Sequence, residues 1–585
     1  MKPSLLKLIQ DQIDIRRVPF SDRGSRLLVY QHINISSLYV KLAERLIGIE
    51  PGIESYLRRP PFIDDLCFID GQGKMLDFKT VTSPEMLRFQ SPVGDFCLVF
   101  QDLNTLSFGL PNHTPIGIRF RVRPIHWHKT DYGGELKHVR NAVYSANNCL
   151  VISNQIWADQ DGMLVEFIVK PEQDSSITIC IGDNPSPSQV RFSIIAKNAR
   201  ARWERWFDSA PEVNEPYREK YAYAWWVMAN NLMSPNGFIT QEAMMPTKAF
   251  YVGAWLWDSA LHAIAHRHID PELARNQIRV MLAHQLSDGM LPDAVFDEGV
   301  VSEISHPIHG RVTKPPILAW AALKIHETEP DLDFLNEIYN PLMRCNAWWF
   351  DFNDDDGDGI VQYTHPYSSG LDDSPLWDHG MPAESPDINT YLHIQMSSLA
   401  TIAEMLGKPD EAEDWRRKAR TLTDLMTEHL WDDETGIFRA LYNEKPIPVI
   451  SPFNLYPLWT GQLSSQITNR LLEHLRDPAE FWGKFGLPTV AYNDPAYAAD
   501  KMWRGPVWAN INYFFVDALQ KIGEDALAKE LRNKTLELIA SQPGIHEYYN
   551  SFNGEIPDTA APIFGWTAAV FIDLAIQASS QNSNT

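Results

Sequence analysis

Two segments of the chain place carboxylates among aromatic side chains, a combination suited to cleaving glycosidic bonds. The first, HPYSSGLDDSPLWD at residues 365–378, carries Asp372 and Asp373. The second, GIHEYYNSFNG at residues 544–554, carries Glu547. Hydrolysis of a glycoside needs one carboxylic acid that protonates the leaving oxygen and one carboxylate that activates water. We therefore predict that these two segments face each other across a pocket for a sugar.

Aromatic rings frame the adjacent aspartates. Tyr367 and Trp377 flank them in sequence, and burial against these rings would keep an aspartic acid protonated near neutral pH. Flat indole faces also suit the C–H groups of sugars, although any one of the 19 Trp residues can equally fill a helical core. The surrounding motif has to decide between the two interpretations.

Two loops near the middle of the chain add polar candidates. YVGAWLWDSALH at residues 251–262 carries Trp257 and Asp258, and this aspartate fits either a helix cap or a ligand for sugar hydroxyls. QLSDGMLPD begins with Gln285. Its Gly and Pro are typical of a helix end, so the glutamine either belongs to a turn or faces the pocket.

A further loop, KMWRGPVW at residues 501–508, places Trp503 and Trp508 on either side of Arg504. An arginine in this position can pair with a carboxylate for structural reasons alone. It can also orient Glu547 or a substrate hydroxyl. The flanking Trp rings favour the functional interpretation.

The segment NDDDGDG spaces Asp354, Asp356 and Asp358 as the first ligands of a calcium loop are spaced. The twelfth position would be His365 instead of the glutamate that an EF-hand needs, so the EF-hand interpretation fails. An acidic turn without metal is the simpler interpretation. A calcium site of another kind stays open, and we expect no other cofactor.

The composition excludes several classes of protein. The chain has 585 residues and a net charge of -24, which would repel nucleic acid and anionic lipid surfaces. Asp11 and Asp14 interrupt the apolar start, and no run of 18 apolar residues follows, so we expect neither a signal peptide nor a membrane span. Five cysteines without CxxC spacing favour a reducing cytoplasm. Oligomeric state stays open.

The pattern of apolar residues changes near residue 195. Before it, short alternating runs punctuated by Gly and Pro predict an antiparallel, sandwich-like β domain over residues 1–195. After it, about a dozen helical stretches follow one another over residues 196–585. Six helical hairpins closed into an α/α toroid fit that count, and loops of such a toroid converge on one pocket. A solenoid would show a fixed repeat length, and none is visible.

Over residues 215–580 the chain resembles glycoside hydrolase family 63, the processing α-glucosidase and mannosylglycerate hydrolase group, with family 37 trehalases as more distant relatives. The resemblance depends on the order of several motifs: WLWDSALH, TKPPILAWA, SGLDDSPLWD, DINTYL, WRGPVW, HEYYNSFNGE and FGWTAAV. It implies a mostly α fold, an (α/α)6 barrel after the β-rich domain, and hydrolysis of an α-glycosidic bond with inversion.

The resemblance also implies roles for single residues. Asp372 corresponds to the general acid and Glu547 to the general base. Relatives often have Asn where Asp373 stands, so the choice between the two aspartates stays open. Substrate contacts are expected from residues of these motifs and of the neighbouring loops: Trp257, Asp258, Gln285, Tyr367, Gly370, Trp377, Trp503, Arg504 and Trp508. We expect an exo-acting α-glucosidase for a small di- or oligosaccharide.

Other functions stay open beside this one. A hydrolase of a mannosyl- or glucosylglycerate-like solute fits the same family. A phosphorylase would need a cluster of cations and no base, which Glu547 disfavours. A polysaccharide lyase would use His546 or Tyr548 as its base. A non-catalytic carbohydrate-binding protein would tolerate the loss of both carboxylates.

Overall fold

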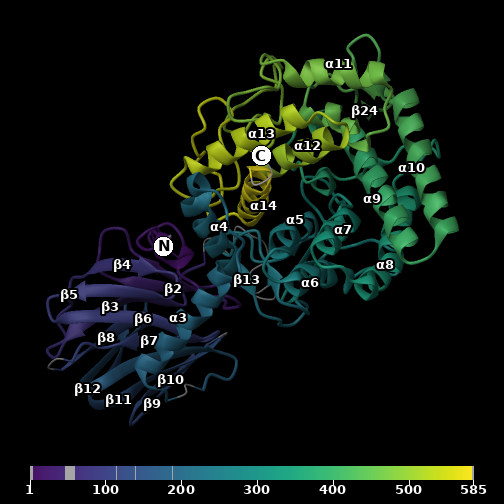
Figure 1. The fold of residues 1–585 in the computed structure, drawn as a ribbon. Helices are drawn as coiled ribbons and strands as arrows, with labels where there is room; N and C mark the ends of the chain where they lie inside the picture. The colour runs from purple at the N-terminus through teal and green to yellow at the C-terminus, as the bar shows by residue number, and fades with distance from the viewer. Residues whose placement is uncertain (1–3, 46–58, 113–114, 139, 187–188, 583–585) are drawn as a thin grey trace. The chain divides into compact units, whose positions relative to one another are not determined.

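The computed structural model describes residues 4–45, 59–112, 115–138, 140–186 and 189–582 (Figure 1). Contacts along the chain divide it into two compact units. The first comprises Met1–Ala210, Ala229–Ser234 and Lys248–Val252, and the second comprises Pro211–Met228, Pro235–Thr247 and Gly253–Thr585. None of the helices in the described ranges combines the length and the apolar character needed to cross a membrane.

The first unit is a large antiparallel sheet, drawn in purple and blue in Figure 1. Its central path runs β1-β2-β3-β8-β12-β7-β6-β5-β4, and β11, β10 and β9 continue it from β12. The short helix α1 (Leu5–Leu8) precedes it. The strands are β1 (Leu27–Gln31), β2 (Leu38–Leu42), β3 (Ile63–Asp70), β4 (Lys79–Ser83), β5 (Met86–Ser91), β6 (Gly94–Asp102), β7 (Thr105–Gly109), β8 (Ile116–Val122), β9 (His126–Thr130), β10 (Gly133–Lys137), β11 (Asn141–Asp159) and β12 (Gly162–Gly182).

Alternation of apolar side chains explains this sheet. Phe68, Phe89, Phe96 and Phe108 all point to one interior, and the rings of Phe68 and Phe96 stack 4.1 Å apart. The ring of Phe68 also lies 5.2 Å from that of Phe89 and 6.3 Å from that of Phe108, so these rings form a common core. The predicted antiparallel β-rich region is confirmed.

The apolar runs at residues 164–170 and 177–182 predict two separate strands by their composition, but they are two halves of the single strand β12. Its first half pairs with β8 and its second half with β7, while the long neighbour β11 pairs with both. The pairing of β11 with β12 shifts register at Asn147/Cys149 and at Val151/Ser153, as at a β-bulge.

The helix α3 (Phe192–Asp208) also belongs to the first unit. Ile195 and Ala199 on this helix pack against Val99 of β6 in a buried apolar cluster. The boundary predicted at residue 195 falls within the first turn of this helix, and where the chain divides into independently folding domains stays a prediction.

Helices dominate the second unit, in the teal-to-yellow part of Figure 1. The succession of helices predicted over residues 196–585 is present, and residues 452–460 form a 3-10 helix. The elements are η1 (Glu215–Tyr217), α4 (Arg218–Asn230), α5 (Leu256–His266), α6 (Pro271–Leu282), α7 (Leu318–Thr328), α8 (Leu332–Phe352), η2 (Pro366–Ser369), η3 (Pro375–His379), α9 (Pro386–Met405), α10 (Pro409–His429), η4 (Pro452–Thr460), α11 (Ser465–Arg476), α12 (Ala509–Lys521), α13 (Asp525–Ala540) and α14 (Gly565–Asn582).

Six of these elements contact one another in a closed circuit. The order is α14, α5, α7, α9, η4, α12 and back to α14. Other helices pack on members of this ring: α6 on α5, α10 on α9, α11 on η4 and α13 on α12. Loops that join the ring elements therefore meet at its ends.

Local signals begin many of these helices. Asp270, Asp331 and Ser464 each accept a hydrogen bond from a backbone N–H of the first turn, at the starts of α6, α8 and α11. Short strands line the loops between them: β13 (Leu232–Met233), β14 (Ala243–Met244), β15 (Ala254–Trp255), β16 (Ala294–Phe296), β17 (Gly299–Val301), β18 (Glu303–Ile304), β19 (Gly310–Arg311), β20 (Gln362–Tyr363), β21 (Ala383–Glu384), β22 (Trp431–Asp432), β23 (Ile437–Phe438), β24 (Leu441–Tyr442) and β25 (Lys445–Pro446).

Candidate active site

The two adjacent aspartates lie between η2 and η3, in a segment that we call the acid loop (residues 365–379). Gly370 ends η2 with a φ of 74°, a left-handed conformation that favours glycine. A Cβ atom at this position would lie 2.4 Å from Cζ2 of Trp257. Only glycine lets the acid loop pass this close to the indole, so the structure brings Gly370 and Trp257 into contact.

Asp372 lies at the edge of a buried charged cluster. Its side chain is 37% exposed, yet Oδ1 is buried and accepts no hydrogen bond from the described residues. Burial raises the pKa of Asp372 to about 6; Asp293 and Asp373 add to the rise, and Lys314 opposes it. Because a general acid must hold its proton at the working pH, this raised pKa suits proton donation.

The neighbouring Asp373 is engaged in holding the loop. Its Oδ1 accepts a hydrogen bond of 2.9 Å from the backbone N–H of Trp503. Burial raises its pKa, whereas that hydrogen bond and Arg504 lower it. Arg504 itself forms two hydrogen bonds, of 2.8 and 2.7 Å, with the carboxylate of Asp378. This pairing fits the structural role of Arg504, and its contact with a substrate hydroxyl stays a prediction.

Glu547 is buried, with 4% of its surface exposed. Its Oε2 accepts a hydrogen bond of 3.2 Å from the backbone N–H of Ala561. Its own backbone N–H donates to the carbonyl of the same alanine, at 2.9 Å. These two bonds fix both the backbone and the carboxylate of Glu547 on the segment that leads into α14.

The segments carrying the two carboxylates are joined through residues 502–508. Asp373 accepts from the backbone of Trp503, and Val507 exchanges backbone hydrogen bonds of 2.7 and 3.0 Å with Tyr549. Burial raises the pKa of Tyr548 to about 12, and the negative charges of Glu547 and Asp373 contribute. Tyr548 therefore lies within electrostatic reach of both segments.

Four indole rings pack into one wall beside these segments. Trp503 and Trp508 stack at 3.7 Å with an angle of 7° between their planes. Trp566 lies 5.2 Å from Trp257 and 5.4 Å from Trp508. Trp257, Trp503 and Trp508 are only 1–2% exposed, so the wall rigidly positions the loops. Their contact with a sugar ring stays a prediction.

Behind Asp372 lies a buried group of charged side chains. Lys314 forms an ion pair of 2.9 Å with Asp293, which directly precedes β16. Asp258, in the first turn of α5, is 3% exposed, and its Oδ1 has no hydrogen-bond partner in the described part of the chain. Burial raises the pKa of Asp258 to about 8. This raised pKa favours the neutral carboxylic acid, which can donate a hydrogen bond to a hydroxyl or accept one from it.

Comparison with known proteins decides the family. The family described as "Mannosylglycerate hydrolase MGH1-like glycoside hydrolase domain" matches residues 251–567, more than half of the chain. The chain belongs to this family. It is a glycoside hydrolase of family 63, as the sequence motifs indicated, and the inversion implied by the resemblance is consistent with that assignment.

Two relatives of this family 63 chain are named as hydrolases of glycosylglycerates. It is 26% identical over 404 residues to mannosylglycerate hydrolase from Thermus thermophilus. The matched region covers 56% of this chain and 95% of the relative. It is 25% identical over 415 residues to glucosylglycerate hydrolase from Mycolicibacterium hassiacum, covering 55% of this chain and 92% of the relative.

Solved structures extend the likeness to the fold. A mannosylglycerate hydrolase from Thermus thermophilus, solved in complex with glucose, matches 60% of this chain and 99% of its own, with a TM-score of 0.52 and 24% identity. A bacterial glucoamylase with acarbose matches 98% of this chain and 95% of its own, with a TM-score of 0.54 and 12% identity. At these identities the two likenesses concern the fold alone.

Other predicted contacts of the family 63 site have structural partners. The side-chain amide nitrogen of Gln285 donates to the carbonyls of Gly289 and Pro341, both at 2.8 Å. The indole N–H of Trp377 donates to the carbonyl of Leu371 at 2.8 Å, which fixes the acid loop. Whether these side chains also contact a sugar stays a prediction.

Two residues of this site, Lys314 and Asp293, were not assigned from the sequence. Both lie in motifs that were singled out, TKPPILAWA and QLSDGMLPD. The signal was a charged residue inside an otherwise apolar run directly before a helix or strand, where burial forces the charge to find a partner.

The predicted calcium ligands do converge. Oxygens of Asp354, Asp356 and Asp358 lie within 4.8 Å of one another. However, Asp354 accepts hydrogen bonds from the backbone N–H groups of Gly357 and Gly359, at 2.9 and 3.1 Å. The turn therefore uses its carboxylates on its own backbone, and calcium stays a prediction.

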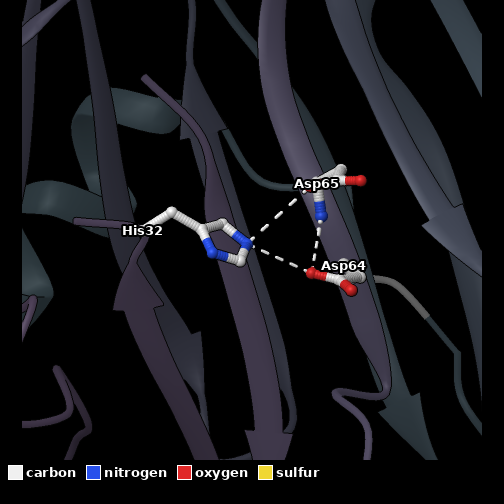
Figure 2. A group of neighbouring side chains, drawn as sticks. All are labelled: His32, Asp64 and Asp65. Carbon is white, nitrogen blue, oxygen red and sulfur yellow. Dashed lines mark hydrogen bonds and ion pairs between the residues drawn. The ribbon is translucent and has the colours of Figure 1, made fainter. Parts of the chain in front are cut away.

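A second group of ligand-type side chains lies in the first unit (Figure 2). Nε2 of His32 is 3.2 Å from Oδ1 of Asp64 and 3.8 Å from Oδ1 of Asp65. Asp65 also pairs with Arg121, which in turn binds Asp159 at 2.8 Å. Arg121 offsets charge on Asp65 and Asp159, and His32 contacts Asp64, so the group is a charge network between strands.

Proposed function

We propose that this family 63 enzyme hydrolyses an α-glycosidic bond with inversion, using Asp372 as general acid and Glu547 as general base. The observation that carries the proposal is the contrast between the two adjacent aspartates. Asp372 has a buried oxygen without a hydrogen-bond partner in the described residues and a pKa of about 6, whereas Asp373 is bound to the backbone of Trp503.

In this mechanism Asp372 transfers its proton to the glycosidic oxygen as the bond to the anomeric carbon breaks. Glu547 accepts a proton from a water molecule, and the water oxygen attacks the anomeric carbon from the opposite face. Room for that water requires the two carboxyl groups to lie roughly 6.5–9.5 Å apart. The fixed position of Glu547 on the Ala561 backbone supports its role as the base, because it limits where the water can be held.

We also propose that the helical unit is an (α/α)6 barrel. The closed circuit of α14, α5, α7, α9, η4 and α12 supports an inner ring of six, with the remaining helices outside. In such a barrel the acid loop, which precedes α9, and the Glu547 segment, which precedes α14, belong to the same end of the ring.

For the substrate we propose a small soluble α-glycoside cleaved at its terminal sugar. The names of the relatives favour a mannosyl- or glucosylglycerate over the di- or oligosaccharide expected from the motifs. Asp258 would receive a sugar hydroxyl at Oδ1, which has no hydrogen-bond partner among the described residues. The reaction needs no cofactor, and we expect it to take place in the cytoplasm.

The properties of Tyr548 argue against the polysaccharide lyase alternative. A lyase needs a tyrosine or histidine that gives up its own proton readily and then removes one from the sugar. Burial raises the pKa of Tyr548 to about 12, and its hydroxyl is hydrogen-bonded to Thr559 at 2.7 Å. A tyrosine with such a pKa is a poor base at neutral pH.

The test is a panel of purified glycosides: glucosylglycerate, mannosylglycerate and α-linked glucose disaccharides. Proton NMR during the first minutes should show release of the β-anomer of the sugar from an α-glycoside. Asp372→Asn and Glu547→Gln should each slow the release by at least about 100-fold while the circular dichroism spectrum stays unchanged. Near-normal turnover in either variant would exclude the proposed roles, and release of the α-anomer would exclude inversion.

A further inference from the structure

Lys314 is a buried cation that contacts three separate groups. Its side chain is 6% exposed, and Nζ lies 2.9 Å from Oδ1 of Asp293 and 3.8 Å from Oδ1 of Asp372. The same Nζ donates a hydrogen bond to the carbonyl of Tyr367, in the 3-10 helix that leads into Asp372. One ammonium group thus connects the residue before β16 to the acid loop.

We propose that Lys314, paired with Asp293, is a positioning residue that holds the carboxyl group of Asp372 where it can protonate the leaving oxygen. This inference rests on the proposed role of Asp372 as the general acid. Lys314 itself does not transfer a proton, because its ammonium group is already committed to two carboxylates and a carbonyl.

The free-energy cost of burying a charge indicates that Lys314 does more than fill space in the core. Burying an ammonium ion costs several kcal/mol unless its partners compensate. Burial lowers the pKa of Lys314, but the charges of Asp293 and Asp372 more than offset this, so its pKa is raised and the group stays charged. A salt bridge to Asp293 alone would satisfy the charge. The bond to the carbonyl of Tyr367 connects that charge to the acid loop.

The same arrangement makes the acid sensitive to its neighbours. Five groups act on Asp372 or are acted on by it: Lys314, Asp293 and Asp373 shift its pKa, and it shifts those of Tyr367 and Asp258. Lys314 lowers the pKa of Asp372, whereas Asp293 raises it. Activity falls as the pH rises through the pKa of the general acid. Loss of Lys314 should therefore move that fall to higher pH, and loss of the Asp293 charge should move it to lower pH.

The experiment compares kcat, KM and the pH profile of kcat/KM for Lys314→Met, Lys314→Arg and Asp293→Asn. We expect Lys314→Met to lower kcat by about 100-fold through misplacement of the acid, with the alkaline fall at higher pH. Asp293→Asn should shift that fall to lower pH. Lys314→Arg keeps the charge, so its alkaline fall should stay at the wild-type position.

Lys324→Met is the matched control. Lys324 lies on α7, ten residues after Lys314, and forms a comparable ion pair of 3.1 Å with Asp517. Its loss should lower the melting temperature but leave the pH profile unchanged. A general loss of stability would affect both lysine variants alike, whereas a positioning role moves the profile only for Lys314.

Two results overturn the inference: wild-type kcat with an unmoved profile in Lys314→Met, or shifts of the same sign in Lys314→Met and Asp293→Asn. If Lys314→Met does not fold, the profiles of Lys314→Arg and Asp293→Asn decide in the same way. Failure of the proposed function looks different, because Asp372→Asn would then keep its turnover whatever the Lys314 variants do.

Discussion

Two aspartate-rich segments of the helical unit use their carboxylates in opposite ways. In the acidic turn (residues 353–359), both oxygens of Asp354 accept backbone hydrogen bonds, and Asp358 accepts from Ile360 at 2.7 Å. In the acid loop, one oxygen of Asp372 is buried and accepts none from the described residues. An acidic turn stabilises itself, whereas a carboxyl group kept without such bonds retains its capacity for chemistry.

The comparison also explains the two raised pKa values. The pKa values of Asp354 and Asp372 are both raised by burial, but backbone N–H groups pull that of Asp354 back down. Asp372 receives no such bond at its buried oxygen, and its pKa reaches about 6. Hydrogen bonds to a carboxylate favour its charged form. The same residue type is therefore a turn former in one loop and a candidate acid in the other.

The largest expected effect separates the two segments by activity. Asp372→Asn should lower kcat by about 10²- to 10⁴-fold, the range of general acid catalysis. The matched variant in the turn, Asp356→Asn, should leave kcat within about twofold, since a surface substitution of this kind changes little. Initial rates on the cleaved glycoside measure both. Equal losses in the two variants would erase the proposed distinction.

The pH dependence of activity gives a second test of the difference between Asp372 and the acidic turn. Because the acid works only while protonated, kcat/KM should fall as the pH rises through the pKa of Asp372, about 6. In Asp356→Asn the fall should stay at the same pH. Rates measured from about pH 4 to 9 with a substrate whose charge does not change over that range test this, since the range brackets the expected pKa. A rate that stays constant across the whole range would contradict the assignment of the acid.

A pair of glycines tests the difference in packing. Gly370 and Gly357 have almost equal φ values of 74° and 75°, but a Cβ meets Trp257 at 2.4 Å in the first and nothing within 4 Å in the second. Gly370→Ala should cost about 2–5 kcal/mol of unfolding free energy and Gly357→Ala about 1–2 kcal/mol. Urea denaturation measures both, and similar costs would refute the close contact with the indole.

Asp373 should matter for stability of the loop. Asp373→Ala leaves the backbone N–H of Trp503 without its acceptor, which should cost about 1–3 kcal/mol. Asp373→Asn keeps an acceptor oxygen and should recover most of that. Thermal unfolding of the pair gives the answer. If the alanine variant instead loses all turnover at full stability, Asp373 would be the acid.

The smallest effect concerns calcium. Because the turn engages its carboxylates on its own backbone, about 1 mM calcium should stabilise the protein by less than about 0.4 kcal/mol, which corresponds to a dissociation constant above about 1 mM. Melting curves with calcium and with EDTA measure this, with Asp356→Asn as the control. A rise of several degrees that the variant abolishes would establish a calcium site.

Most of the helical unit could be predicted because its helices are encoded locally. Apolar side chains recur with helical spacing, and α11 begins and ends where its sequence pattern does. The strands of the large sheet were harder to predict from the sequence. Strands such as β9, with four of its five residues exposed, carry little alternation, and the two halves of β12 differ only in the partners they pair with.

The candidate site also contains residues that the sequence predicts and residues that it does not. Asp372 and Glu547 stand out in the sequence because each lies among aromatic residues in a glycine-containing segment. Lys314 and Asp293 do not, because nothing in TKPP or LPD says that one ammonium group reaches a carboxylate 21 residues earlier and a second one 58 residues later.

By itself, the sequence determined the kinds of element, the family and the two segments that hold the carboxylates, since these depend on neighbours within a few residues. Only the tertiary structure decided which of two adjacent aspartates is held by a backbone bond and which faces a buried lysine. The physical reason is that burial and pairing set the chemistry of a carboxyl group, and both come from residues distant in the chain.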